Sequence, residues 1–151
     1  MIRLKKIYLL ALMAMAFVVP KQLNAQQDLQ IGKVFDQYGK KKGVVMVQLT
    51  KEMLQGYNFS LFKSIVIKND SVAAAFTRKC IAKDQEGAKK IKQVLQNGEV
   101  SSIILQLAPR GDENRLILYN ESLDEKKELT LIYIESTMDA EKIITMILKK
   151  K

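Results

Sequence analysis

The residues able to do chemistry in this chain are few in kind. The 151-residue sequence has no histidine, no tryptophan and one cysteine, Cys80. Without histidine and with one cysteine, the chain can form no histidine-assisted catalytic triad, no histidine-ligated metal site, no zinc site of clustered cysteines and no intramolecular disulfide. No glycine-rich phosphate loop and no Gly-x-Ser-x-Gly turn occurs in the sequence. We therefore expect no cofactor and no metal ion.

Carboxylates are the remaining catalytic candidates, because two of them in one cleft can act as general acid and general base. The candidates are Glu52, Asp70, Asp84, Glu99, Asp112, Glu113, Asp124, Glu125 and Asp139. Most of these residues fall at expected helix starts or in turns, where capping of the backbone explains an acidic side chain. A carboxylate-based hydrolase is therefore an alternative, and a non-enzymatic protein is the leading hypothesis.

Two segments could contact a partner. Tyr57 and Phe59 flank polar residues in one expected loop, whereas Arg110 and Arg115 lie in and just after an expected turn over residues 109–114. Aromatic and arginine side chains are enriched in binding surfaces. The structural alternative is that these residues only form the turn and anchor the loop to the core. On the binding interpretation, the partner is an unknown envelope protein or a small ligand.

Ser71 and Cys80 each admit a structural and a functional interpretation. Asp70-Ser71-Val72 resembles the short Asp-Ser/Thr-apolar signal for O-glycosylation of exported Bacteroidetes proteins, and the same Asp-Ser pair is a good helix N-cap. Val72, Phe76 and Cys80 share one face of the expected helix, which predicts a buried apolar cysteine. Without a histidine to activate it, a nucleophilic cysteine is not expected.

The charge is strongly positive, with 25 Lys and Arg against 16 Asp and Glu, a net charge of +9 and a pI near 9.6. Seven of these positive charges lie near the termini, and without them the net charge is +2; they are Arg3, Lys5, Lys6, Lys21, Lys149, Lys150 and Lys151. No aromatic residue is interleaved with the basic runs, so nucleic-acid binding is not expected. Weak contact of the tail or of residues 40–42 with anionic envelope polymers is an alternative to a solvated surface.

The first 25 residues have the layout of a secretory signal peptide. Arg3, Lys5 and Lys6 precede an apolar run of 13 residues over 7–19, and Leu23-Asn24-Ala25 forms a cleavage site before Gln26. A membrane span needs about 20 apolar residues, so this run is short for an uncleaved anchor, which is the alternative. We expect a single exported domain over 26–151 with a basic C-terminal tail. It would reside in the periplasm or at the cell surface, with no stable membrane span.

The elements that must position these residues follow from periodicity and from turn residues. The spacing predicts helices over 28–38, 70–82 and 85–96, and a last helix that Thr137 caps. It predicts strands over 44–49, 61–68, 102–107, 115–119 and 129–135, in the order α-β-β-α-α-β-β-β-α. Asn97-Gly98 is interpreted as the end of the helix over 85–96, and residues 50–54 as one helical turn. In the last helix Ala140, Ile143, Ile144 and Ile147 form an apolar stripe.

The short connections between the last three strands favour an antiparallel meander. The strand over 129–135 is apolar on both sides, which is typical of a central or covered strand. The sequence therefore predicts a single α+β domain in which helices pack on a largely antiparallel sheet.

Several segments resemble a known group of proteins. They are Ile31-Gly-Lys-Val-Phe35-Asp-Gln-Tyr38, Gly43-Val-Val-Met-Val47, Thr50-Lys51-Glu52-Met53-Leu54, Leu61-Phe62-Lys63-Ser64-Ile65, Leu107-Ala-Pro109-Arg110-Gly111 and Leu129-Thr-Leu-Ile-Tyr133-Ile-Glu135. With the signal peptide, they resemble small exported Bacteroidetes proteins catalogued as domains of unknown function. The resemblance implies an envelope or secreted location and the α+β fold, and it implies no catalytic residues.

The leading functional hypothesis is thus an exported, non-enzymatic module that acts by protein or ligand contact. Besides a hydrolase, the alternative is a small-molecule or lipid carrier of the cell envelope. A carrier would need an apolar cavity of roughly 300 Å³ or more.

Overall fold

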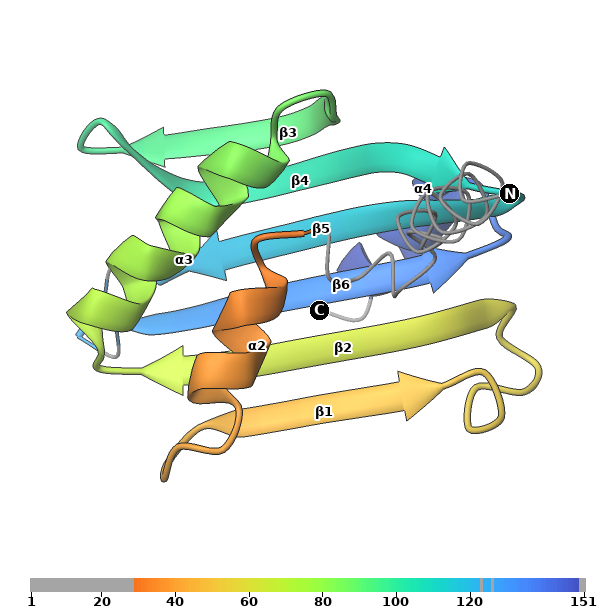
Figure 1. Cartoon of the computed structure of the whole chain (residues 1–151). Coiled ribbons are helices and arrows are strands. Elements are labelled where there is room, and N and C mark those ends of the chain that lie inside the picture. Colours follow the sequence, from red (N-terminus) through yellow and green to blue (C-terminus); the bar gives the residue numbers. More distant parts are fainter. Residues whose placement is uncertain (1–28, 123, 126, 150–151) are drawn as a thin grey trace, which may run out of the picture.

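The computed structural model describes residues 29–122, 124–125 and 127–149. The signal peptide predicted for residues 1–25 lies outside these residues. The helices are α2 (Gly32–Tyr38), α3 (Ser71–Asp84) and α4 (Ala140–Leu148). The strands are β1 (Val45–Thr50), β2 (Phe59–Lys68), β3 (Lys89–Gln96), β4 (Glu99–Arg110), β5 (Glu113–Glu121) and β6 (Glu128–Ser136). All neighbouring strands are antiparallel, in the sheet order β1-β2-β6-β5-β4-β3 (Figure 1).

This architecture confirms the predicted α+β domain with helices packed on an antiparallel sheet. The expected meander is present as β4, β5 and β6, and β6 lies in the middle of the sheet between β5 and β2. Strand β6 is apolar on both sides because, as predicted, both of its sides are covered. Leu129, Leu131 and Tyr133 pack into one core, and Ile132 and Ile134 pack into another on the opposite side.

The two cores define the two faces of the sheet. Helices α2 and α3 cross one face, here called the α2/α3 face, and α4 lies behind the other, here called the α4 face (Figure 1). The core on the α2/α3 face is the larger and includes residues of both helices and of β2, β4, β5 and β6. The core on the α4 face is built from Ile104, Leu116, Leu118 and Ile134 beneath Ala140 and Ile143 of the short helix.

The helix expected over residues 85–96 is wrong, because this segment contains strand β3. Asn97 and Gly98 do not end a helix. With φ of 53° and 80°, they form the two-residue turn of the β3–β4 hairpin, a turn that favours Asn-Gly. Register shifts between Lys90 and Lys92 and between Val94 and Leu95 disturb the alternation of the strand, so its apolar residues lie at helix-like spacing. The observed order is α-β-β-α-β-β-β-β-α.

Capping also differs from expectation at two helices. Helix α4 begins at Ala140 with Asp139 at the N-cap position, so Thr137 does not cap it. Asp84 does not start a helix but is the last residue of α3. Its buried carboxylate accepts hydrogen bonds from the backbone N–H of Gln30 (2.7 Å) and of Ile31 (2.9 Å) at the start of α2. An acidic residue distant in sequence therefore supplies the cap of α2 and ties it to α3.

Helix α3 buries a different stripe from the expected one. Val72 is 73% exposed, whereas Ala73, Thr77, Cys80 and Asp84 are buried. These four residues are spaced i, i+4, i+7 and i+11, which is one helical face turned toward the sheet. The prediction of a buried Cys80 is confirmed, and Val72 does not share its face.

Candidate functional site

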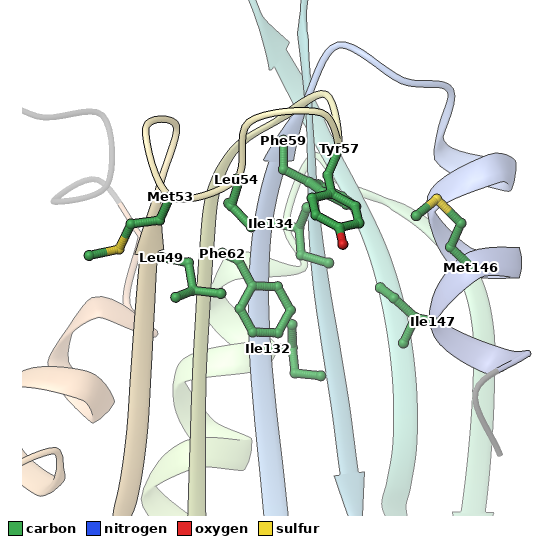
Figure 2. Close-up of a pocket in the computed structure, with 10 residues that line it drawn as sticks. All are labelled: Leu49, Met53, Leu54, Tyr57, Phe59, Phe62, Ile132, Ile134, Met146 and Ile147. Carbon is green, nitrogen blue, oxygen red and sulfur yellow. The ribbon is translucent and has the colours of Figure 1, made fainter.

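The α4 face carries an apolar groove. Helix α4 covers only part of this face, and the β1–β2 loop over residues 51–58 stands opposite it. Between them lies a groove of about 460 Å³ (Figure 2). Its lining residues come from β1, the β1–β2 loop, β2, β6 and α4; they are Leu49, Met53, Leu54, Tyr57, Phe59, Phe62, Ile132, Ile134, Met146 and Ile147.

The strand register builds the floor of the groove. Leu49 of β1 lies directly opposite Phe62 of β2, and Phe62 lies directly opposite Ile134 of β6. Residues paired in this way on neighbouring strands point to the same face of a sheet, so the three side chains form a continuous apolar row. Figure 2 shows Met146 and Ile147 of α4 facing this row from the other side.

The β1–β2 loop forms the second wall through its own backbone turns. The N–H of Leu54 bonds the carbonyl of Thr50 at 3.0 Å, and the N–H of Tyr57 bonds the carbonyl of Leu54 at 3.0 Å. Asn58 then adopts a φ of 57°, a left-handed conformation that asparagine tolerates, as the chain enters β2. These turns account for the segment expected as one helical turn, and they direct Leu54 and Tyr57 into the groove (Figure 2).

The groove can bind apolar groups and offers little polar chemistry. Among its ten lining residues the only polar side-chain group is the hydroxyl of Tyr57, a residue that is 57% exposed. Methionines lie at both sides, with Met53 68% and Met146 37% exposed. Flexible methionine side chains adapt to ligands of different shape. The driving force for a ligand here is burial of apolar surface, at about 25 cal/mol per Å².

A polar hollow of about 340 Å³ adjoins the groove and shares Leu54 and Phe59 with it. The β1–β2 loop, the β4–β5 turn and the segment after β6 meet there, and Ser60 donates a hydrogen bond to the carboxylate of Glu113. The hollow also contains Lys51 and Asp112, so it carries charges of both signs. Groove and hollow together form a surface that is apolar at one end and polar at the other.

The structure divides the predicted contact residues between two places. Tyr57 and Phe59 both line the groove. Arg115 lies opposite Glu135 of β6, on the α2/α3 face, since its neighbour Leu116 belongs to the core of the α4 face. Both arginines lie outside the groove lining: Arg110 pairs with the carboxylate of Glu135, and the Nε of Arg115 donates to the carbonyl of Ala108 at 3.0 Å.

Two carboxylates, the buried Glu135 and the half-buried Glu121, form clusters of the same kind at opposite ends of the α2/α3 face. Glu135 accepts a hydrogen bond from the hydroxyl of Tyr133 at 2.7 Å and also forms an ion pair with Arg110. Glu121 accepts one from the hydroxyl of Tyr119 at 2.6 Å and two from the guanidinium of Arg78, at 2.6 and 2.9 Å.

Burial, and next the hydrogen bond to a carboxylate, raises the pKa of Tyr119 and of Tyr133 above the usual tyrosine value. Both phenols therefore stay protonated and act as donors to Glu121 and Glu135. Each carboxylate is also neutralised by an arginine. These clusters satisfy buried polar groups at the strand ends and resemble structural ion-pair networks.

Three of the candidate acids for hydrolysis have structural roles. Asp70 and Asp84 cap helices, and Glu99 lies 3.7 Å from Arg78, which also holds Glu121. The guanidinium of Arg78 thus lies between the carboxylates of Glu99 and Glu121. Within the described parts of the chain, no group of three or more Cys, Asp or Glu side chains could hold a metal ion.

Ser71 and Cys80 occupy contrasting positions on α3. Ser71 is exposed at the first residue of the helix, and the cap is supplied by Asp70, whose Oδ1 accepts from the N–H of Ala73 at 2.9 Å. The glycosylation candidate is therefore accessible and is not needed for capping. Cys80 is 4% exposed, and burial raises the pKa of its thiol.

No helix in the part of the chain that the structure describes is long and apolar enough to cross a membrane.

Most of the groove could not be found from sequence. Leu49, Phe62, Ile132 and Met146 are ordinary apolar residues of strands and a helix, and only the sheet order brings them together. The usable signal was the pair of aromatic residues in the β1–β2 loop.

Comparisons with known proteins place the chain by family alone. No curated protein matches the chain, and no solved structure matches it. One family model, described as a family of unknown function (DUF6108), matches residues 18–147. This match covers most of the sequence, and we conclude that the chain belongs to the DUF6108 family.

Proposed function

We propose that this chain is an exported, non-enzymatic binding protein that holds the apolar chain of an amphiphilic, lipid-like ligand in the groove of the α4 face. The observation that carries the proposal is an apolar groove of about 460 Å³ with a single polar lining group and a polar hollow beside it. The volume falls in the range of small-molecule sites, roughly 300 to 1,000 Å³. Export rests on the signal peptide predicted for residues 1–25.

The arrangement favours an amphiphile over a wholly polar or wholly apolar ligand. A polar ligand would lose its hydration against the row of Leu49, Phe62 and Ile134 without gaining hydrogen bonds. An amphiphile can bury its chain on this row and place its head at Ser60 and Lys51 in the hollow, in contact with water. A non-enzymatic role is supported by the acids themselves, since the buried ones are neutralised by arginine or used as helix caps.

The proposal predicts how affinity depends on the ligand. Each buried methylene group contributes about 0.8 kcal/mol, so the dissociation constant for straight-chain alkyl carboxylates should fall about fourfold per added methylene until the groove is full. The purified protein is loaded with an environment-sensitive apolar fluorophore, which carboxylates of increasing chain length then displace. An affinity independent of chain length would contradict the proposal.

A matched pair of variants locates the site. Met146→Glu places a charge in the groove and should weaken binding about tenfold or more, because the carboxylate must lose water when the chain binds. Ile91→Glu on β3 is the control: Ile91 is 38% exposed, close to the 37% of Met146, and does not line the groove. Equal effects of the two substitutions would show that the ligand binds elsewhere.

A further inference from the structure

The two edges of the sheet are built differently. Strand β3 forms one edge, carries Lys89, Lys90 and Lys92, and pairs with β4 through two register shifts. Strand β1 forms the other edge, has no charged residue and pairs with β2 without a register shift. Its outer position is visible in Figure 1, where no other described element flanks it. Charges and bulges are the usual means of keeping an edge strand unpaired, and β1 has neither.

The exposed side chains of β1 are also unusual for a free edge. Val45 is 59% and Val47 is 38% exposed, and both lie on the α4 face beside Leu49, which lines the groove. The free backbone N–H and C=O groups of an edge strand can hydrogen-bond to a further strand. Strand β1 thus offers an added strand both a backbone edge and an apolar row.

The charges on the two edge strands indicate which of these strands could pair between two copies of the chain. Pairing β3 with β3 would gather Lys89, Lys90 and Lys92 of both copies at one interface, where their positive charges would repel one another. Pairing β1 with β3 would leave one open edge on each copy and would extend into a filament. Pairing β1 with β1 opposes no like charges and closes after two copies, leaving the lysine-rich β3 at both ends of the joined sheet.

One register gives this pair an apolar match. Centred on Val47, antiparallel pairing places Val47 opposite Val47 of the partner subunit and Val45 opposite Leu49 of the partner subunit. Side chains on one face of a sheet repeat every second residue, so all these pairs fall on the α4 face. Moving the centre to Gln48 would instead oppose Val45 to the charged Lys51 of the partner subunit. The sequence of β1 is therefore complementary to itself about Val47.

We propose that the chain forms a two-fold symmetric dimer through antiparallel pairing of β1 with β1 of a second copy, centred on Val47. The symmetry axis is perpendicular to the joined twelve-stranded sheet, so both grooves open on the same side. The exposed Val45 and Val47 of the two copies form an apolar strip between the grooves. The dimer does not depend on the nature of the ligand.

Sedimentation velocity of the purified protein tests this assembly. The wild type should sediment as a dimer, and Val47→Lys should sediment as a monomer, because two ammonium groups would face each other at the symmetry axis. Val94→Lys is the matched control: Val94 is also 38% exposed, lies on the other edge strand, and should leave the dimer intact. Thermal melts monitored by circular dichroism establish that both variants are folded.

A charge-swap experiment tests the register. Val47→Glu alone should be monomeric, and an equimolar mixture of the Val47→Lys and Val47→Glu proteins should regain the dimer. A wild-type protein that stays monomeric would overturn the proposal and leave the edge to a strand of different sequence. A dimer that persists in Val47→Lys, or that is lost equally in Val94→Lys, would overturn it as well.

Discussion

The hydrogen bonds that Asp84 accepts at the start of α2 lead to a testable prediction about what holds α2 to α3. The carboxylate lies at the C-terminal end of α3, is 8% exposed, and accepts hydrogen bonds from the N–H groups of Gln30 and Ile31. Asp84→Ala removes the acceptor from both donors at once. Asp70→Ala is the control, because Asp70 caps its own helix through a single bond to the N–H of Ala73.

The magnitude follows from the donors left without an acceptor. Each buried N–H that loses its acceptor costs about 1–3 kcal/mol, so the loss of two should lower the free energy of unfolding of Asp84→Ala by about 2–6 kcal/mol. Asp84→Asn keeps one acceptor oxygen and should cost about half as much. The local cap at Asp70 should cost about 1 kcal/mol. The order Asp84→Ala, Asp84→Asn, Asp70→Ala is thus the expected ranking of destabilisation.

The pH dependence provides a second readout. Burial raises the pKa of Asp84, and the hydrogen bonds from Gln30 and Ile31 and the charge of Lys33 only partly oppose this. A carboxyl whose pKa is higher in the folded state than in the unfolded state stabilises the fold at low pH. This contribution is lost as the pH rises from about 4 through the folded-state pKa. The cost of Asp84→Ala should therefore be larger at pH 4 than at pH 7.

Urea denaturation of the wild type and the three variants at both pH values measures these differences. Two results would refute the reasoning. An Asp84→Ala cost no larger than that of Asp70→Ala would mean that the long-range bonds add nothing to the local cap. A cost that grows from pH 4 to pH 7 would mean that the charged carboxylate is favoured in the folded state.

Two further predictions concern single residues. Cys80 should resist iodoacetamide in the folded protein and react at once in denaturant, because it is 4% exposed and burial raises its pKa; labelling of the folded protein at the rate of a free thiol would disprove this. Gly98→Ala should destabilise the fold by about 1 kcal/mol in urea denaturation, since Gly98 has a φ of 80° in the β3–β4 turn. Gly98→Asn should cost less, and equal costs would argue against a conformational origin.

Local patterns were sufficient for much of the fold. The period-2 and apolar runs located β1, β2, β4, β5 and β6, and the stripe of the last helix located α4. Strand β6 was predicted to be central because it is apolar on both sides, and it lies between β2 and β5. Such patterns can be read from sequence because each strand side chain points to a fixed face of the sheet.

Local patterns failed where two structures share one pattern. The residues of β3 match a helical stripe because two bulges shift their alternation, and Asn97-Gly98 suits a helix end as well as a hairpin turn. Pairing with β4 decides between these structures, and pairing is a long-range interaction. Asp84 is a similar case, since its capping partners lie more than 50 residues away in the sequence.

The sequence by itself determined the class of the fold, the burial of Cys80 and two of the groove residues, Tyr57 and Phe59. Only the tertiary structure decided that these two face an apolar groove and that Arg110 and Arg115 lie outside it. The physical reason is that a binding site is a relation between strands and helices in space. Alternation along one strand indicates which of its side chains share a face of the sheet. The order of the strands determines which side chains of different strands lie next to one another on that face.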